Sequence, residues 1–152
     1  MSQPRPPSAD GPPSIVIRAG VDQLAAVRAF VRAQSALAVA DEETTADLVQ
    51  AVDELVCNVV EHGYAGQPGE VVVAALTGDR EIAFRIRDAA PAFDPRSVPT
   101  PALDLPLGER RLGGMGVHLA RTLTDGMDHR ILPTGGNEVT VRKRLRRTAA
   151  EG

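Results

Sequence analysis

The positions of proline constrain this sequence more than any other feature, because proline is excluded from helix interiors and from central strands. Five of the twelve prolines lie within residues 1–13, and five more lie between Pro91 and Pro106. The first cluster predicts a disordered tail, and the second predicts one long loop inside a compact domain. We therefore expect tails at residues 1–13 and 148–152 and a single domain at residues 14–147.

The rarity of several residue types excludes whole classes of function. The chain has one cysteine, which rules out an intrachain disulfide and a multi-cysteine zinc site, and one lysine, which is too far along the chain for a Walker-type phosphate loop. A net charge of −3 and only four aromatic residues argue against a nucleic-acid-binding protein. Without a long apolar run, we expect a cytoplasmic protein with no membrane contact.

Apolar spacing predicts a run of alternating strands and helices. Strands are expected at residues 14–19, 70–77, 81–87, 128–132 and 138–145, and helices at residues 21–39, 41–62 and 115–125. Short turns between consecutive strands favour antiparallel pairing. The predicted fold is α+β, a two-layer α/β sandwich with a mixed, mostly antiparallel sheet and about three helices on one face.

The second predicted helix carries the first candidate site. Glu54 and Asn58 are four residues apart, so their side chains are neighbours on one helix face. A carboxylate accepts protons from a nucleophile, and an amide oxygen is a ligand suited to Mg²⁺. The alternative is the solvated polar face of an amphipathic helix, which also produces such a stripe.

The second candidate site lies where a strand gives way to the proline-rich loop. Asp88 ends the strand, and its carboxylate is suited to accept a hydrogen bond from an exocyclic amine such as that of adenine. The alternative is a turn-forming aspartate before the loop.

The third candidate site is a glycine cluster that leads into the last predicted helix. Gly113, Gly114 and Gly116 let backbone N–H groups approach phosphate oxygens, and the positive end of the helix adds to the attraction. The alternative is a flexible hinge at the helix start.

These signals follow one another in a specific order. The stretches are ELVCNVVEHGY from residue 54, DAAPAFDP from residue 88, GGMGVHLARTLTD from residue 113 and GGNEVTVRK from residue 135. In this order they resemble the Bergerat ATP-binding fold of the histidine-kinase-like ATPases, and most closely the stand-alone anti-sigma factor serine/threonine kinases. The resemblance covers about residues 14–147.

The resemblance implies a site for ATP and Mg²⁺. Glu54 would be the general base that activates the attacking hydroxyl, Asn58 would hold Mg²⁺, and Asp88 would bind the adenine amine. Residues from about Ser97 to Leu112 would form a lid over ATP. The remaining nucleotide contacts would come from Ala90, Phe93, Arg110, Arg111, Gly113, Gly114, Met115, Gly116, Val117 and Thr140.

The resemblance also implies partners. Such proteins bind a sigma factor, phosphorylate a serine or threonine on an anti-anti-sigma antagonist protein, and commonly form homodimers. One position departs from the family pattern, because Ala90 stands where glycine is usual, two residues after the adenine-binding aspartate. A methyl group there could crowd the adenine or restrict the backbone. The alternative function is therefore a non-catalytic module that binds a sigma factor or antagonist, with weak or no nucleotide binding.

Overall fold

The computed structural model describes residues 11–91 and 112–145, and at Val21 and residues 112–117 it describes the backbone alone. The predicted lid, both outer tail segments and the predicted ligands Phe93, Arg110 and Arg111 lie outside the described residues. The elements, in chain order, are β1 (Ser14–Arg18), a 3₁₀ turn (Val21–Gln23), α1 (Leu24–Leu37), α2 (Glu42–Asn58), a π-helical turn (Val59–Gly63), β2 (Glu70–Thr77), β3 (Glu81–Asp88), α3 (Leu112–Leu123), β4 (Gly126–Ile131) and β5 (Asn137–Arg144).

The described strands form one open sheet in the order β1-β2-β3-β5-β4, and every neighbouring pair is antiparallel. The predicted α+β class and the antiparallel pairing are confirmed, and no parallel pair appears within the described residues. The hydrogen bonding of the sheet also reaches one residue into the predicted tail. The carbonyl of Pro13 accepts a hydrogen bond from the Ala75 N–H at 2.9 Å, an ordinary length for such a bond.

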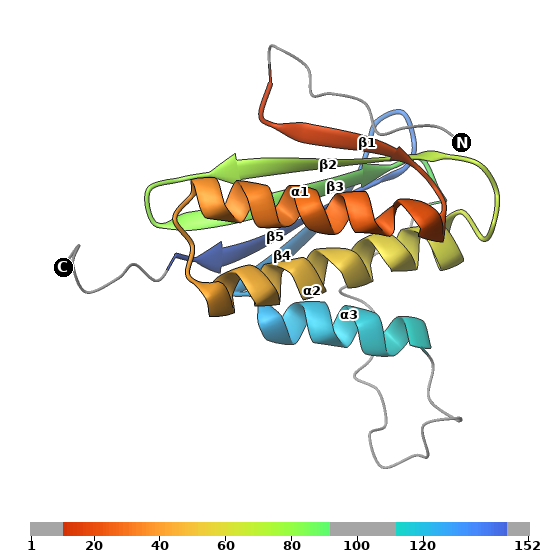
Figure 1. Cartoon of the computed structure of the whole chain (residues 1–152). Helices are drawn as coiled ribbons and strands as arrows, with labels where there is room; N and C mark the ends of the chain where they lie inside the picture. The colour runs from red at the N-terminus through yellow and green to blue at the C-terminus, as the bar shows by residue number, and fades with distance from the viewer. Residues whose placement is uncertain (1–10, 92–111, 146–152) are drawn as a thin grey trace.

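The three α-helices lie on one side of the sheet (Figure 1), as predicted. The core between the layers is aliphatic, as the scarcity of aromatic residues requires, and its largest fully buried side chain is Phe84, which meets Phe30 edge to face at 6.4 Å between ring centres. The apolar face of α2 is buried at Leu48, Val52, Leu55 and Val56. This packing fixes α2 against the sheet, and with it the positions of Glu54 and Asn58.

Helix α2 begins and ends at features that matter for the site. The helix begins one residue after its predicted start, and Asp41 caps it, because the Asp41 carboxylate accepts a hydrogen bond from the Thr44 N–H at 2.7 Å. At the other end the helix does not simply stop. It widens into the π-helical turn Val59–Gly63, closed by a hydrogen bond from the Tyr64 N–H to the Val59 carbonyl at 2.8 Å. Such turns are rare and occur frequently at functional sites.

Helix α3 begins at Leu112, three residues before the predicted start at Met115. Its other end is tied down by Lys143 of β5, whose ammonium donates to the Leu123 carbonyl at 2.7 Å and pairs with Asp47 of α2 at 3.2 Å. One side chain therefore links α3, α2 and the sheet.

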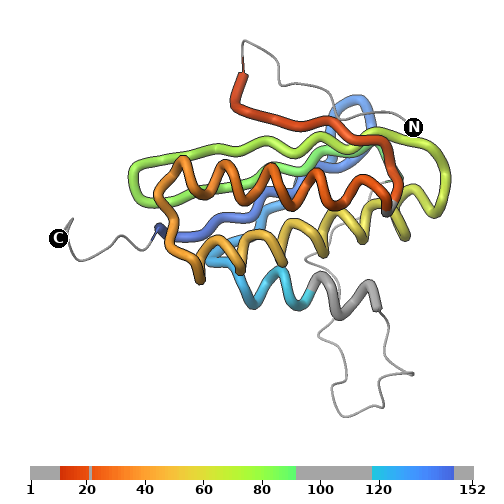
Figure 2. Tube along the Cα trace, in the orientation of Figure 1, coloured from red at the N-terminus to blue at the C-terminus, as the bar shows by residue number. Residues whose placement is uncertain are grey.

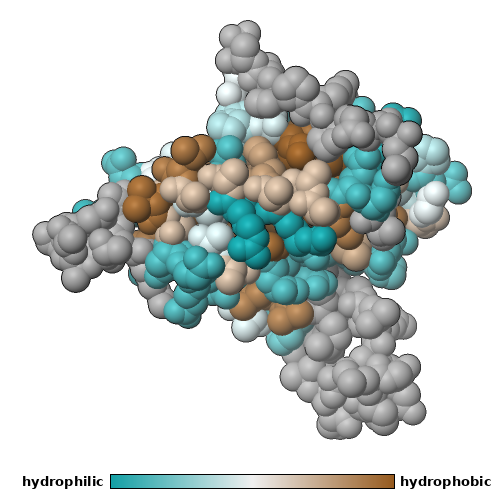
Figure 3. Space-filling model, in the orientation of Figure 1, coloured by the Kyte–Doolittle hydropathy of each residue, from teal (hydrophilic) through white to brown (hydrophobic). Residues whose placement is uncertain are grey.

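Segments that are far apart in the sequence meet at one end of the molecule. Figure 2 shows the end of α2, the end of β3 and the turn between β4 and β5 gathered there. At the other end α1 turns into α2, and the space-filling view shows apolar side chains toward that end (Figure 3). Leu37 and Val39 are 76% and 60% exposed at this turn, and Val39 has a left-handed φ of 60°.

Candidate functional site

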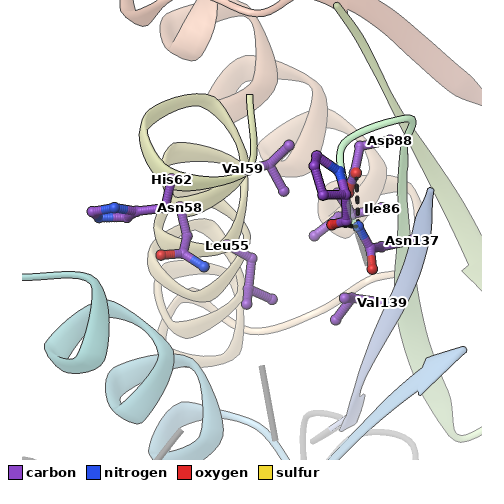
Figure 4. A pocket seen from close by; sticks show the side chains of 10 residues that line it. Leu55, Asn58, Val59, His62, Ile86, Asp88, Asn137 and Val139 are labelled. Atoms are coloured by element: carbon purple, nitrogen blue, oxygen red, sulfur yellow. Dashed lines mark hydrogen bonds between the residues drawn. The ribbon is translucent and has the colours of Figure 1, made fainter. Parts of the chain in front are cut away.

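A cavity of about 240 Å³ lies between α2 and the strands β3 and β5. Its walls are formed by Leu55, Asn58, Val59, His62, Gly63, Ile86, Asp88, Pro91, Asn137 and Val139. Figure 4 shows Leu55 and Val59 pointing toward the strands, whereas Asn58 and His62 point to the side on which α3 lies. Pockets for complete drug-sized ligands usually measure 300–1,000 Å³, so this cavity is suited to part of a ligand, such as a planar base.

Asp88 is the only carboxylate that the described residues contribute to the wall of this cavity. The residue is 7% exposed, and its Oδ1 accepts hydrogen bonds from the Ala90 N–H at 2.9 Å and from Asn137 Nδ2 at 3.1 Å. No described residue donates a hydrogen bond to its other oxygen, Oδ2. Burial raises the pKa of Asp88, while the bonds from Asn137 and Ala90 oppose that rise. The carboxylate therefore has one anchored oxygen and one oxygen available to a ligand.

Asn137 is a site residue that the sequence interpretation missed. Its Nδ2 donates to Asp88 and also to the carbonyls of Pro91 at 3.0 Å and Ala90 at 3.3 Å. The preceding residue, Gly136, makes this possible. Its φ is +99°, and a Cβ there would lie 2.9 Å from the Ala89 Cα and still closer to the Asp88 carbonyl oxygen. Gly136 thus lets the start of β5 approach the end of β3 closely, in addition to forming part of the turn before β5.

Tyr64 fixes the same strand end from the side of α2. Its phenol oxygen accepts a hydrogen bond from the Ala89 N–H at 2.8 Å and donates one to the Glu70 carbonyl at 2.7 Å. The π-helical turn brings Tyr64 into this position. The signal was the EHGY run after the Glu/Asn helix, but nothing local in it shows which backbone groups the phenol would meet.

The predicted pair Glu54 and Asn58 lies on α2 as expected. Asn58 contributes to the cavity wall, and its amide makes no hydrogen bond with a described residue. Glu54 lies one turn earlier, outside the wall, where Gln50 Nε2 donates to its Oε1 at 2.9 Å. Burial, followed by the charge of Asp53, raises the pKa of Glu54, which makes it a stronger proton acceptor than an exposed glutamate.

The predicted glycine cluster lies inside the first turns of α3 rather than before the helix. The first four N–H groups of an α-helix have no partner within the helix, and residues 112–115 hold these positions in this 12-residue helix. The expected backbone contacts at Gly113, Gly114 and Met115 are compatible with this geometry, whereas the N–H groups of Gly116 and Val117 lie beyond the first four and donate within the helix.

Ala90 does not occupy the cavity. It is 2% exposed and contributes no atom to the cavity wall. Its methyl group faces Gly63 of the π-helical turn, where a second Cβ would lie only 3.1 Å away. Ala90 also does not need the backbone freedom of glycine. Among the described residues other than glycine, only Val39 and Ala65 have a positive φ, so the backbone of Ala90 is in a region open to any residue. The absence of a side chain at Gly63 leaves room for the methyl group of Ala90.

Thr140 is not brought to the cavity. Side chains alternate along β5, so the buried Val139 and Val141 face the helices and Thr140 faces the opposite side of the sheet. We therefore replace Thr140 with Asn137 among the candidate nucleotide contacts.

The described residues contain no preformed cluster of metal ligands. No group of three His, Cys, Asp or Glu side chains there is arranged to hold a metal ion. A magnesium ion at Asn58 would accordingly take most of its ligands from phosphate and water, which Mg²⁺ tolerates well.

No helix among residues 11–91 and 112–145 is long and apolar enough to cross a membrane.

Comparison with known families matches residues 17–143 to the "Histidine kinase-like ATPase domain". The chain belongs to this family. The histidine kinase-like ATPase fold accounts for the open antiparallel sheet with its helices on one face, and for a cavity beside the end of α2. The resemblance inferred from the four ordered motifs is confirmed at this level.

A solved structure of this ATPase fold is similar over most of the chain. It is the crystal structure of the RsbU and RsbW domains of Rv1364c from Mycobacterium tuberculosis, with a TM-score of 0.62 and 30% sequence identity. The match covers 90% of this chain and 34% of that one. This chain thus corresponds to about a third of the similar protein, and its fold is of the anti-sigma factor kinase type.

Proposed function

We propose that this chain is an ATP-dependent serine/threonine protein kinase that also acts as an anti-sigma factor. It would bind a sigma factor, and it would phosphorylate an anti-anti-sigma antagonist protein by transferring the γ-phosphoryl group of ATP to a serine or threonine hydroxyl. The family membership and the similarity to a protein with an RsbW domain support this role.

The observation that carries the proposal is the state of the Asp88 carboxylate. One oxygen is held by two donors, the other accepts no hydrogen bond from a described residue, and Asp88 lines a cavity whose walls are largely apolar. A planar base that inserts between Leu55, Ile86 and Val139 would meet this oxygen with its exocyclic amine. Adenine has such an amine, whereas guanine presents a carbonyl oxygen at the equivalent position and would be repelled.

The remaining groups have roles along the direction from base to phosphate. The Asn58 amide would hold Mg²⁺, which when bound neutralises phosphate charge, and the N–H groups of the first turn of α3 would receive phosphate oxygens. Glu54 would accept the proton of the attacking serine or threonine hydroxyl. In phosphoryl transfer most of the rate enhancement comes from positioning and charge stabilisation, so a glutamate with a raised pKa suffices as the base.

The alternative, a module that binds its partners without nucleotide, was motivated by Ala90. Because the Ala90 methyl group packs against Gly63 and away from the cavity, this motivation is weakened. Calorimetry with Mg-ATP separates the two functions, since the absence of heat and of any thermal shift would favour the binding module.

The direct test is phosphotransfer. The chain is incubated with radiolabelled ATP and candidate antagonist proteins encoded near it, and phosphoserine or phosphothreonine is sought. Glu54→Ala is expected to bind ATP but to transfer no phosphate, with Glu43→Ala, an exposed glutamate in the first turn of the same helix, as the matched control. Unchanged transfer by Glu54→Ala would contradict the assigned base.

A further inference from the structure

The face of the sheet that points away from the helices carries a cluster of arginines. The α-helices lie on one side of the sheet (Figure 1), and none of the described helices covers the other side. Alternate residues of each strand point to this outer face. Arg87 of β3 lies opposite Glu138 of β5, which lies opposite Arg130 of β4. Arg85 lies two residues before Arg87 and opposite Thr140.

The carboxylate in this cluster is already shared by two arginines. Glu138 accepts hydrogen bonds from Arg130 Nε at 2.9 Å and from Arg87 Nε at 2.6 Å. The bonds from Arg130 and then Arg87 lower the pKa of Glu138 to about 2, so this side chain is ionised at neutral pH. A second carboxylate of the outer face, Asp128, pairs with Arg142.

Arg85 has no such partner. The residue is only partly buried, but its Nε is fully buried and makes no hydrogen bond. Burial, followed by the charge of Arg87, lowers the pKa of Arg85, and the charge of Glu138 opposes this only in part. Three guanidinium groups thus surround one carboxylate. A buried polar group without a partner calls for an explanation, and an absent anionic ligand is one.

An apolar groove adjoins Arg85 on the same face. It is lined by Leu76 and Ala83 of the sheet, by the prolines at residues 12–13 and by Thr140. Ala83 precedes Arg85 by two residues along β3, and Thr140 lies opposite Arg85 on β5. An apolar side chain in the groove would therefore lie next to the guanidinium group.

The charges of the rest of the molecule narrow the class of ligand. Helix α2 carries acidic residues along its length and no basic one, and the whole chain has a net charge of −3. A long polyanion such as nucleic acid would be repelled by this charge, whereas a short acidic segment would meet only the outer face. A free phosphate ion would leave the apolar groove unused.

We propose that Arg85 and the adjoining groove form a docking surface for an acidic segment of a partner protein. A carboxylate of the segment pairs with the guanidinium group of Arg85, and a neighbouring apolar side chain enters the groove. This surface lies on the side of the sheet opposite to the cavity at Asp88, so the inference does not depend on the proposed ATP site.

The first test uses a probe peptide on the wild-type protein. The peptide is blocked at both ends and has one leucine between two pairs of glutamates, and in its control each glutamate is replaced by glutamine. Nitrogen-15 NMR follows the Nε–H signal of Arg85, which is assigned by its loss in Arg85→Met. The glutamate peptide is expected to shift this signal until saturation, and the glutamine peptide to leave it in place. The absence of a shift with the glutamate peptide would overturn the proposal.

The second test removes the charge at matched positions. Arg85→Met keeps an apolar stem without the guanidinium group, and Arg32→Met makes the same change at an exposed arginine of α1. Calorimetry is expected to show roughly tenfold weaker binding of the glutamate peptide to Arg85→Met, and wild-type affinity for Arg32→Met. Equal affinities of the two variants would overturn the inference.

Urea denaturation checks that the loss is not one of folding. Because Arg85 makes no ion pair or hydrogen bond with a described residue, Arg85→Met is expected to unfold at a urea concentration no lower than that of the wild type. A lower midpoint would show that the guanidinium group stabilises the chain itself, and would overturn the proposal.

Rival occupants give different results in the same assays. A shift of the Arg85 signal by inorganic phosphate as large as that by the peptide, tighter binding of a DNA duplex than of the peptide, or self-association that is lost in Arg85→Met would each overturn the proposal. Binding of Mg-ATP by Arg85→Met is expected to equal that of the wild type. If the wild-type protein binds no ATP, the proposed function fails, and the peptide titration still decides this inference.

Discussion

The adjacent glycines before β5 provide a matched pair for testing how the site is built. Both have left-handed backbones, with φ of +86° at Gly135 and +99° at Gly136. A Cβ at Gly135 would meet nothing within 4 Å, whereas at Gly136 it would press on the backbone of Asp88 and Ala89. Substitution by alanine therefore imposes the same kind of backbone strain at both positions but a steric clash at only one.

The expected costs differ accordingly. Gly135→Ala should lower the free energy of unfolding by about 1–2 kcal/mol, the cost of a left-handed backbone for a residue with a side chain. Gly136→Ala should add about 1–3 kcal/mol for overpacking, because the contacted atoms belong to the main chain and cannot rotate away. The total of about 2–5 kcal/mol would be accompanied by displacement of Asn137 from Asp88.

Urea denaturation and calorimetry measure the two consequences separately. We expect Gly135→Ala to bind Mg-ATP as wild type does, and Gly136→Ala to bind at least tenfold more weakly under conditions in which it remains folded. Equal destabilisation of the two variants, or wild-type ATP affinity in Gly136→Ala, would refute the close approach of β5 to the end of β3 as the basis of the site.

Three further outcomes are expected. Asp53→Asn removes a charge that raises the pKa of Glu54, so the pKa of Glu54 should fall. Phosphotransfer decreases at acidic pH as Glu54 becomes protonated, and in this variant a pH–rate profile should show that decrease at lower pH. A shift of the decrease to higher pH would contradict the assignment of Glu54 as the base. Ala90→Gly should change ATP affinity less than threefold, because the methyl group contacts Gly63 and not the cavity, and calorimetry on both proteins checks this. Val39→Gly should raise the free energy of unfolding by about 1 kcal/mol in urea titrations through relief of its left-handed backbone, with no change in ATP binding.

Much of the fold was predictable because local chemistry and global packing agree. Alternation along residues 81–87 predicted β3 to within one residue, and α2 begins within one residue of its predicted start. The glycines at the start of α3 were less informative, since glycine disfavours helix, yet the helix already begins at Leu112.

The site was predictable in outline but not in its connections. Glu54, Asn58 and Asp88 were identified from residue type and position, and the structure places Asn58 and Asp88 in one cavity. Thr140 was included among the contacts although the period of two along β5 puts it on the outer face, and Asn137 was not identified. The contacts of Tyr64 with Ala89 and of Gly136 with Asp88 join residues that are 25 or more positions apart, and no local pattern reveals them.

The engagement of Lys143 has a consequence for the chemical modification of this protein. It is the only lysine in the sequence, so it is the only side chain here that reagents or enzymes specific for primary amines can target. Acetylation would remove the charge that pairs with Asp47 and reduce the donors available to the Leu123 carbonyl. A single acyl group on the sheet would thereby loosen the far end of the helix whose first turn carries the glycine cluster.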